Sequence, residues 1–386
     1  MPLLRRRTAA PLPVAVPWAM LDLLREGAAP LATADQAARD GGPLRVAVVV
    51  PSFRRGSGGH STIAHLVRGL EALGHDCSIW LADDEGRHAE EAPEQVRDTF
   101  YEFFGPLAAP VHKGFKGWDG ADVAVATGWQ TVPRVLCLPG SAARGYLVQD
   151  HEPDFYGASA ERTWAEQTYG MGLHCIAASP WLARLLAERY GASASAFDLG
   201  VDHERYGPRP VHRRGDLVLV YARAVTPRRA VPLALLAAAE LKRRRPEVEI
   251  ALFGEAREIR TPFPAMHLGV LDGEDLAHAY NSATVGLVLS TTNPSLVPTE
   301  MLACALPCVD LDTPAMRETF GAEGPITLAP FDPLAIADAI ERLLDDLELR
   351  AEHVRAGLEL AEGRTWSKAT QQVDAGLRQA LATAAP

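Results

Sequence analysis

Three glycines stand where this sequence could hold an anion. Gly56, Gly58 and Gly59 follow a run of β-branched residues and come directly before a helical pattern. Glycine lets the backbone approach a ligand closely, and the free N–H groups at the start of a helix favour phosphate. The spacing is not GxGxxG, but Asp83 or Asp84 could still serve as the ribose-binding acid of a nicotinamide enzyme, and a tight turn without a ligand is a further alternative.

A second candidate anion site is a group of arginines in the other half of the chain. Arg223, Arg228 and Arg229 follow the strand expected at residues 217–221. Guanidinium groups repel one another when they cluster, unless an anion lies among them. A diphosphate would neutralise this repulsion, whereas a solvated arginine face whose members point apart would need no ligand.

A third group of polar and backbone donors lies near residue 295. Ser295, Leu296 and Val297 lead from a strand into a helix expected over residues 299–305, so free backbone N–H groups should face a ligand there. Glu300 is predicted in the first turn of that helix, where it could accept hydrogen bonds from the two ribose hydroxyls. A helix-capping acid is the alternative interpretation.

These three groups need a scaffold that brings strand ends together. From residue 44 onward, short aliphatic runs alternate with longer helical patterns, which is typical of parallel sheets with crossover helices. The predicted strands are residues 44–50, 77–81, 123–126, 145–148 and 175–178, then 217–221, 249–253, 285–289 and 308–311. The predicted helices are 60–73, 93–104, 159–169, 180–190, 232–244, 274–281, 299–305, 333–347 and 366–381. The fold class is therefore α/β, with two Rossmann-like, doubly wound domains facing a shared cleft.

The pattern lapses between residues 198 and 214, which predicts a domain boundary there. We expect an N-terminal arm with a short helix over residues 1–43, a first domain over 44–200, a second over 201–365 and a final helix over 366–386. That helix should pack across the hinge or onto the first domain. Arg5, Arg6 and Arg7 before an apolar stretch loosely imitate a signal peptide, but three prolines interrupt it.

Composition excludes several classes of protein. The 386 residues carry 38 Lys and Arg against 49 Asp and Glu, a net charge of −11, which argues against a broad nucleic-acid or membrane-binding surface. The five cysteines form no CxxC pair, so a reduced, cytoplasmic location is expected. No apolar run reaches the roughly 18 residues of a membrane span.

Several short motifs recur together and in order. They are Pro51 with Gly58-Gly59, Gly74-His75-Asp76, Gly200-Val201-Asp202, Arg223 with Arg228, and residues 296–300 with Ala305-Leu306-Pro307. Over residues 44–365 the chain resembles the GT-B glycosyltransferases of the large retaining family 4. Residues 147–155, LVQDHEPDF, resemble a signature of the rhamnosyltransferases that build bacterial surface-layer and cell-wall glycans.

The resemblance implies roles for the residues that match the family motifs. Gly58 and Gly59 would approach the diphosphate and the acceptor side. Arg223 and Arg228, with Arg229 beside them, would bind the leaving diphosphate, and Glu300 would hold the ribose with Ser295, Leu296 and Val297 nearby.

The signature segment and two loops complete the expected site. Either Asp150 or His151 would lie nearest the reacting carbon of the donor sugar, a choice that the sequence leaves open. Gln149, His60 and Trp118 are the expected acceptor-binding residues.

One residue departs from the family pattern. A glutamate normally precedes the ribose-binding one by eight positions, and Thr292 stands at that position here. That glutamate ordinarily contacts hydroxyls of a hexose donor, so its absence favours a deoxysugar, although Asn293 or Ser295 could supply replacement hydrogen bonds.

The predicted reaction is therefore the retaining transfer of a deoxysugar, rhamnose from dTDP-rhamnose, to a glycan, lipid-linked or natural-product acceptor. The donor would be dTDP- or UDP-linked. No metal or other cofactor is expected, and Asp310-Leu311-Asp312 is interpreted as a turn rather than a metal-binding DxD motif. A sugar-nucleotide epimerase of the same build and a non-catalytic binding partner of another transferase remain the alternatives.

Overall fold

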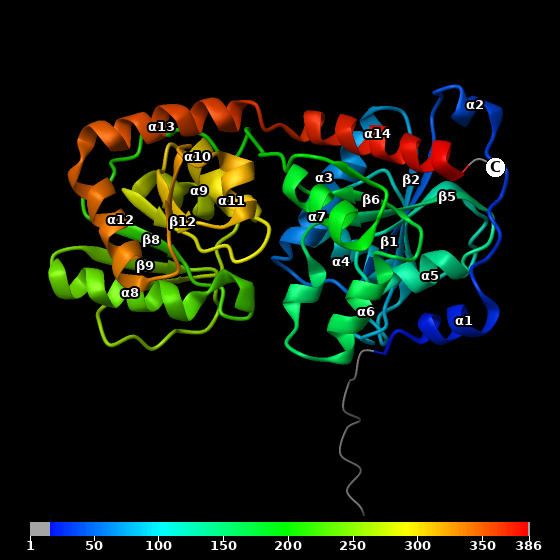
Figure 1. Cartoon of the computed structure of the whole chain (residues 1–386), viewed down its shortest axis with the longest axis horizontal. Helices are drawn as coiled ribbons and strands as arrows, with labels where there is room; N and C mark the ends of the chain where they lie inside the picture. Colours follow the sequence, from blue (N-terminus) through cyan, green and yellow to red (C-terminus); the bar gives the residue numbers. More distant parts are fainter. Residues whose placement is uncertain (1–15, 385–386) are drawn as a thin grey trace, which may run out of the picture.

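The computed structural model describes residues 16–384, which form two lobes, each built around a parallel sheet (Figure 1). Arg5, Arg6 and Arg7 lie outside the described residues. None of the helices within residues 16–384 is both long and apolar enough to cross a bilayer.

The N-terminal lobe contains the first seven strands. Its elements are α1 (Trp18–Glu26), α2 (Gln36–Arg39), β1 (Arg45–Pro51), α3 (Gly58–Ala72), β2 (Asp76–Ala82), α4 (Pro93–Phe104), β3 (Val111–Lys113), β4 (Ala121–Ala126), α5 (Thr131–Cys137), β5 (Ser141–Val148), η1 (Glu152–Phe155), α6 (Ala160–Thr168), β6 (His174–Ala177), α7 (Pro180–Tyr190) and β7 (Ala194–Ala196). The strand order is β3-β2-β1-β4-β5-β6-β7, and all recorded strand pairs are parallel.

The C-terminal lobe repeats this design with six strands. Its elements are β8 (Leu217–Tyr221), η2 (Pro227–Arg229), α8 (Val231–Arg244), β9 (Glu249–Phe253), β10 (Met266–Gly269), α9 (Gly273–Ser282), β11 (Val285–Leu287), α10 (Leu296–Ala303), β12 (Cys308–Leu311), α11 (Pro314–Phe320), β13 (Ile326–Ala329), α12 (Pro333–Asp345) and α13 (Leu347–Glu362). The strand order is β10-β9-β8-β11-β12-β13, again parallel. The predicted fold class of two doubly wound sheets is confirmed.

In both sheets the order of strands reverses next to the first strand, between β1 and β4 and between β8 and β11. Ligands of such sheets bind outside the carboxyl ends of the strands at this point. The first two predicted anion sites follow β1 and β8, so the topology places each of them at such a reversal.

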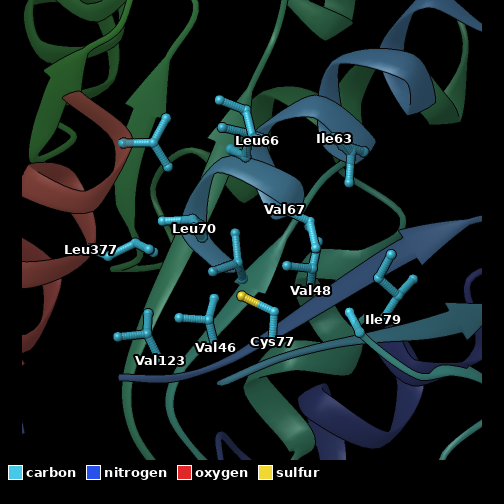
Figure 2. Close-up of a cluster of buried hydrophobic side chains, with 14 of the residues drawn as sticks. Val46, Val48, Ile63, Leu66, Val67, Leu70, Cys77, Ile79, Val123 and Leu377 are labelled. Carbon is cyan, nitrogen blue, oxygen red and sulfur yellow. The ribbon is translucent and has the colours of Figure 1, made fainter. Parts of the chain in front are cut away.

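Both faces of each sheet are covered by apolar side chains. In the N-terminal lobe, Val46 and Val48 of β1 pack under Ile63, Leu66 and Val67 of α3 (Figure 2). β-branched residues favour the pleated strand, and the apolar residues of α3 recur at helical spacing, so local preference and burial agree. This agreement explains why these elements are recognisable in the sequence.

The last helix, α14 (Trp366–Ala384), returns from the C-terminal lobe and packs on α3, β5 and β6 of the N-terminal lobe (Figure 1). Two chain segments cross where it begins: Val201 pairs with Thr365, and Arg364 forms an ion pair with Asp198. A Cβ at Gly200 would lie only 2.6 Å from the backbone nitrogen of Trp366, so this crossing requires glycine.

Several predicted elements differ from the structure. The strands β3, β7, β10 and β13 were not predicted, because edge strands of three or four residues carry too little alternation to stand out. The helices α5, α11 and α13 were also missed, and the predicted helix at 333–347 is divided at Asp346 into α12 and α13.

The helix at the third predicted site also begins earlier than expected. α10 starts at Leu296 rather than at residue 299, because Pro298 lies in its first turn, where the missing N–H is not needed for an intrahelical bond. Glu300 therefore lies in the second turn of α10 and not in the first.

Candidate active site

The glycine-rich loop after β1 faces the C-terminal lobe. Gly56 has φ +74°, a backbone conformation that favours glycine, and a Cβ there would lie 3.9 Å from Nη1 of Arg223. Gly58 begins α3 and has open space beside it, whereas the carbonyl of Gly59 accepts a hydrogen bond from Nε2 of Gln149 at 3.1 Å. The loop and Arg223 therefore lie next to each other where the two lobes meet.

His60, expected to face the acceptor, is turned away from the cleft. Its ring nitrogens lie 2.8 Å from Oγ of Ser57 and 3.2 Å from the carbonyl oxygen of Pro51, and its ring stacks on Phe104. Burial lowers the pKa of His60 to about 4, so the ring is neutral. These contacts give His60 a role in fixing the loop.

The three arginines after β8 have three different environments. Arg223 is half-buried, and its side chain makes no hydrogen bond to any residue from 16 to 384. Arg229 is buried and donates from Nη1 to Oγ of Ser290 at 3.1 Å, inside the C-terminal lobe. The structure therefore keeps Arg223 and Arg228 at the cleft but places Arg229 in the interior.

Arg228 is held by residues of the opposite lobe. Its Nε lies 2.9 Å from Oδ2 of Asp150, and its Cζ lies 3.9 Å from the ring centroid of Phe155. The arginine side chain is one-quarter exposed, and that of Asp150 is 7% exposed. Burial lowers the pKa of Arg228, and the Asp150 carboxylate opposes that shift.

The carboxylate of Asp150 has donors on both oxygens. Oδ1 accepts from the backbone nitrogens of His151 at 2.9 Å and Asn293 at 3.0 Å. Oδ2 accepts from Oγ1 of Thr292 at 3.0 Å, on the side where it meets Arg228. Thr292, at the position of the missing glutamate, is therefore bound to a carboxylate that comes from the other lobe.

Asn293 extends this contact between the lobes. Its Nδ2 donates to the carbonyls of Gln149 at 3.1 Å and Ala178 at 2.6 Å, and its Oδ1 accepts from Oγ of Ser179 at 2.7 Å. Asn293 is fully buried, so the loop after β11 is inserted against the carboxyl ends of β5 and β6.

His151 does not share the position of Asp150. Its Nδ1 lies 2.7 Å from Oδ2 of Asp154, and its Nε2 lies 2.7 Å from the hydroxyl of Tyr190. The ring is buried and has both nitrogens engaged inside the N-terminal lobe. Of the two candidates that the sequence left open, Asp150 is the one whose carboxylate bonds to residues of the C-terminal lobe.

The start of α10 offers donors beside a buried carboxylate. Ser295 is the N-cap residue, its hydroxyl has no partner within residues 16–384, and Leu296 and Val297 follow in the first turn. Glu300 is 8% exposed, and its Oε2 accepts from the hydroxyl of Tyr280 at 3.1 Å. Burial raises the pKa of Glu300 to about 7, so ligand hydroxyl groups that donate to it would favour the ionised form.

The Asp310-Leu311-Asp312 sequence has its carboxylates in separate environments. Asp310 is buried and accepts from the backbone nitrogens of Ser290 at 2.6 Å and Leu311 at 2.7 Å. Asp312 forms an ion pair with Arg317. Within residues 16–384, no three His, Cys, Asp or Glu side chains are grouped closely enough to hold a metal ion.

Trp118 lies apart from the other predicted site residues. It precedes β4, and its Nε1 donates to the carbonyl of Pro139, which precedes β5, at 2.7 Å. Both positions belong to the amino ends of these strands, whereas the cleft lies at their carboxyl ends. Trp118 therefore lies away from the other predicted site residues, and its expected role in acceptor binding stays a prediction.

Sequence reasoning missed two contributors to the cleft. Phe155 stacks on Arg228, and Tyr280 donates to Glu300. Phe155 ends the segment that carries the family signature, so its proximity to a charged partner could have been considered. Tyr280 lies in a helical pattern where an aromatic residue is expected to belong to the hydrophobic core. Nothing in the sequence distinguishes it from an ordinary core residue.

Part of the chain matches a known protein family. Residues 215–346, which contain β8 to α12, match the family described as Glycosyl transferases group 1. The C-terminal lobe is thus similar to the glycosyl transferases group 1 family. Arg223, Arg228, Thr292 and Glu300 all lie within the matched residues, whereas Asp150 and Phe155 lie outside them.

Two curated relatives extend the comparison. The O-antigen biosynthesis protein RfbC of Myxococcus xanthus is 34% identical over 272 residues, which cover 68% of this chain and 21% of that protein. The D-inositol 3-phosphate glycosyltransferase of Frankia alni is 30% identical over 234 residues, which cover 52% of this chain and 57% of that protein. The chain thus spans about a fifth of the first relative and just over half of the second.

Solved structures share the architecture of both lobes. The crystal structure of Anabaena Alr3699/HepE in complex with UDP-glucose superposes with a TM-score of 0.65 at 14% identity, covering 87% of this chain and all of that chain. At this identity the likeness shows the fold alone. The fold is GT-B, as the resemblance in the sequence predicted.

Proposed function

We propose that the chain is a glycosyltransferase that moves rhamnose from dTDP-rhamnose to a glycan, lipid-linked or natural-product acceptor, with retention of configuration. The observation that carries this proposal is the grouping of Arg223, Arg228, the start of α10 and Glu300 at one end of the C-terminal lobe, facing the N-terminal lobe. Two guanidinium groups and free backbone N–H groups suit a diphosphate, and a buried carboxylate suits the ribose hydroxyls.

In this reaction the acceptor hydroxyl oxygen forms a bond to the reacting carbon of the sugar while the bond between the sugar and the phosphate breaks. Negative charge grows on the departing diphosphate, which takes up the proton of the acceptor hydroxyl. Arg223 and Arg228 stabilise that charge more strongly in the transition state than in the ground state. The positive charge that a divalent metal would supply comes from these two arginines, so we propose a reaction without a metal cofactor. The close approach of the two lobes at Asp150 and Asn293 excludes water from the reacting carbon.

One observation supports a deoxysugar donor. Thr292 replaces the glutamate that contacts hexose hydroxyls in the family that the sequence resembles, and its hydroxyl is already bound to Asp150. Another observation concerns the acceptor: the relative from Myxococcus xanthus is named for O-antigen biosynthesis, which agrees with a glycan as the acceptor. The crystal structure of HepE in complex with UDP-glucose makes UDP-linked sugars the comparison to test against dTDP-linked ones.

The test is a panel of sugar nucleotides, measured by thermal shift and by release of the nucleoside diphosphate. We expect dTDP-rhamnose to stabilise the protein most and to be turned over when an acceptor glycan is present. Arg223→Ala and Glu300→Ala should each weaken donor binding. Donor binding that both variants retain at the wild-type level would contradict the proposal, and a changed sugar formed without any acceptor would indicate an epimerase instead.

A further inference from the structure

The arginine expected to bind the diphosphate belongs to the C-terminal lobe, but the groups that orient it belong to the N-terminal lobe. Asp150 lies 2.9 Å from its Nε, and Phe155 lies under its guanidinium plane. Asp150 follows β5, and Phe155 ends η1. The orientation of Arg228 therefore depends on a domain that does not carry it.

The ion pair occupies one nitrogen of Arg228 and leaves the rest of the guanidinium available. Nε is buried 2.9 Å from Oδ2 of Asp150, an ion pair without hydrogen-bond geometry, and neither Nη atom hydrogen-bonds to any residue in the described range 16–384. A guanidinium has five N–H donors, and its two Nη groups can bind two phosphate oxygens in a fork. The arrangement leaves this fork open to a ligand while the stem is fixed.

Asp150 is itself fixed by residues of both lobes. Its carboxylate accepts from the backbone of His151 on its own side and from Thr292 and Asn293 across the cleft. The two cross-cleft bonds exist only while the lobes are in contact. Separation of the lobes would release Asp150 and Arg228 from each other, and Arg228 would lose its aromatic support at the same time.

We propose that Asp150 is a positioning residue, which sets the Arg228 guanidinium for the donor diphosphate and makes this part of the donor site complete only when the two lobes are docked. The inference rests on the proposed function, because it concerns the diphosphate of that donor. It assigns Asp150 a role through Arg228 rather than through contact with the sugar. Phe155 acts in the same way by stacking.

The deciding experiment measures how Asp150→Asn binds dTDP and UDP compared with thymidine and uridine, by calorimetry and ligand-observed NMR. Asn keeps an oxygen for the backbone donors but removes the charge that orients Arg228. We expect the variant to bind the diphosphates about 10- to 100-fold more weakly, as is common when a supporting residue behind a ligand-binding group is removed. Binding of the nucleosides, which lack the diphosphate, should stay within about twofold of the wild type, a selectivity that a merely structural defect would not produce.

The matched control is Glu318→Gln. Glu318 forms another ion pair across the lobes, with Arg184, but neither residue contacts the Arg228 site. This variant removes an interlobe charge pair of the same kind, so it should bind dTDP and UDP like the wild type. If Asp150→Asn does not fold, Phe155→Leu provides the same comparison and should show a smaller loss in the same direction.

Unchanged or tighter diphosphate binding by Asp150→Asn would overturn the inference. Tighter binding would mean that Asp150 competes with the diphosphate for Arg228. A wild-type protein that binds neither dTDP nor UDP would overturn the proposed function as well, so the two failures are distinguishable.

Discussion

The two lobes share one strand order, but the polar groups at their cleft-facing ends differ in what they are free to bind. In the C-terminal lobe, Arg223 and the Nη groups of Arg228 have no hydrogen-bond partner in the described part of the chain. In the N-terminal lobe, His60, Gln149 and His151 are engaged in contacts within that lobe. The C-terminal lobe thus presents free hydrogen-bond donors, whereas these polar side chains of the N-terminal lobe already have partners.

The difference indicates a division of work. For the proposed function, a donor diphosphate needs free cationic N–H donors, and the C-terminal lobe offers Arg223 and the Nη groups of Arg228. Groups that already have partners hold loops and neighbouring residues in place, as Asp150 does for Arg228. A shared sheet topology therefore fixes where a site can be, while the state of individual side chains decides which lobe binds which part of a ligand.

The largest effect that tests this division should come from Arg228→Ala. Loss of one hydrogen-bond donor to a developing negative charge typically costs about 2.7–4 kcal/mol of transition-state stabilisation, so kcat/KM should fall about 100- to 1,000-fold. Steady-state release of the nucleoside diphosphate measures it. Arg317→Ala removes a surface arginine of the same lobe, more than half exposed, and should change kcat/KM by less than about twofold. If kcat/KM of Arg228→Ala falls by less than about fivefold, the proposed division of roles between the two lobes is wrong.

The second prediction concerns the position of the missing glutamate. Thr292→Glu would bring a carboxylate beside Asp150, whose Oδ2 lies 3.0 Å from the present hydroxyl. Two buried like charges repel, so the free energy of unfolding should fall by about 1–3 kcal/mol, measured by urea denaturation. Thr291→Glu, at the exposed neighbouring position, should lower the free energy of unfolding by much less.

A double variant sharpens this result. Asp150→Asn combined with Thr292→Glu removes one of the two charges, so the double variant should lose less stability than the two single variants lose in sum. Strictly additive losses would show that the two residues do not interact in the folded protein.

The third prediction is a pH dependence that only one lobe should produce. Burial raises the pKa of Glu300 to about 7, above its unfolded value, so in the free protein its stabilising contribution is lost as the pH rises through 7. Ribose hydroxyls donate to the ionised form, so binding of dTDP or UDP should strengthen by up to about tenfold between pH 6 and pH 8, with most of the gain below pH 7, and level off above pH 8. Calorimetry at pH 6, 7 and 8 measures this change.

The control variant comes from the opposite lobe. Burial also raises the pKa of Glu152 to about 7, but its Oε2 accepts from the backbone of Trp129 within the N-terminal lobe. Glu152→Gln should keep the pH-dependent rise in affinity, whereas Glu300→Gln should lose it. Ionisation of the nucleotide is common to all three proteins and cancels. If the affinity of Glu300→Gln for dTDP or UDP still rises with pH, Glu300 does not bind the ribose.

The smallest expected effect on turnover belongs to His151→Gln. The ring joins Asp154 to Tyr190 inside the N-terminal lobe, so its loss should lower the free energy of unfolding by about 1–3 kcal/mol. The folded variant should keep kcat within about threefold of the wild type. Thermal denaturation and turnover on the same preparation separate the two effects, and a large loss of kcat without a change in stability would make His151 a reacting group.

Much of the fold could be predicted from the sequence because local signals and burial agree. α4 and α7 were predicted with their observed bounds: Pro93 and Pro180 occupy first-turn positions, and Gly191 ends α7 in a left-handed conformation. The strands at 217–221, 249–253 and 308–311 likewise have the predicted bounds, since long aliphatic runs define buried parallel strands.

The candidate site was predictable only in part. Glycines and arginines at strand ends mark where a ligand could bind, because chain order and strand parallelism fix that edge. The direction in which each side chain points could not be predicted. Nothing local distinguishes Arg228 at the cleft from Arg229 in the interior, or Asp150 from His151, because neighbours in sequence face opposite directions.

The sequence by itself determined two doubly wound sheets, the edge at which they face each other and the residue types gathered there, since hydrophobic periodicity and the alternation of strands with helices are local properties of the chain. The tertiary structure alone decided that Asp150 and Phe155 reach across to Arg228 and that Thr292 binds a carboxylate from the other lobe. Those contacts join segments far apart in the chain, and their geometry depends on how two separately folded sheets pack, which no local pattern encodes.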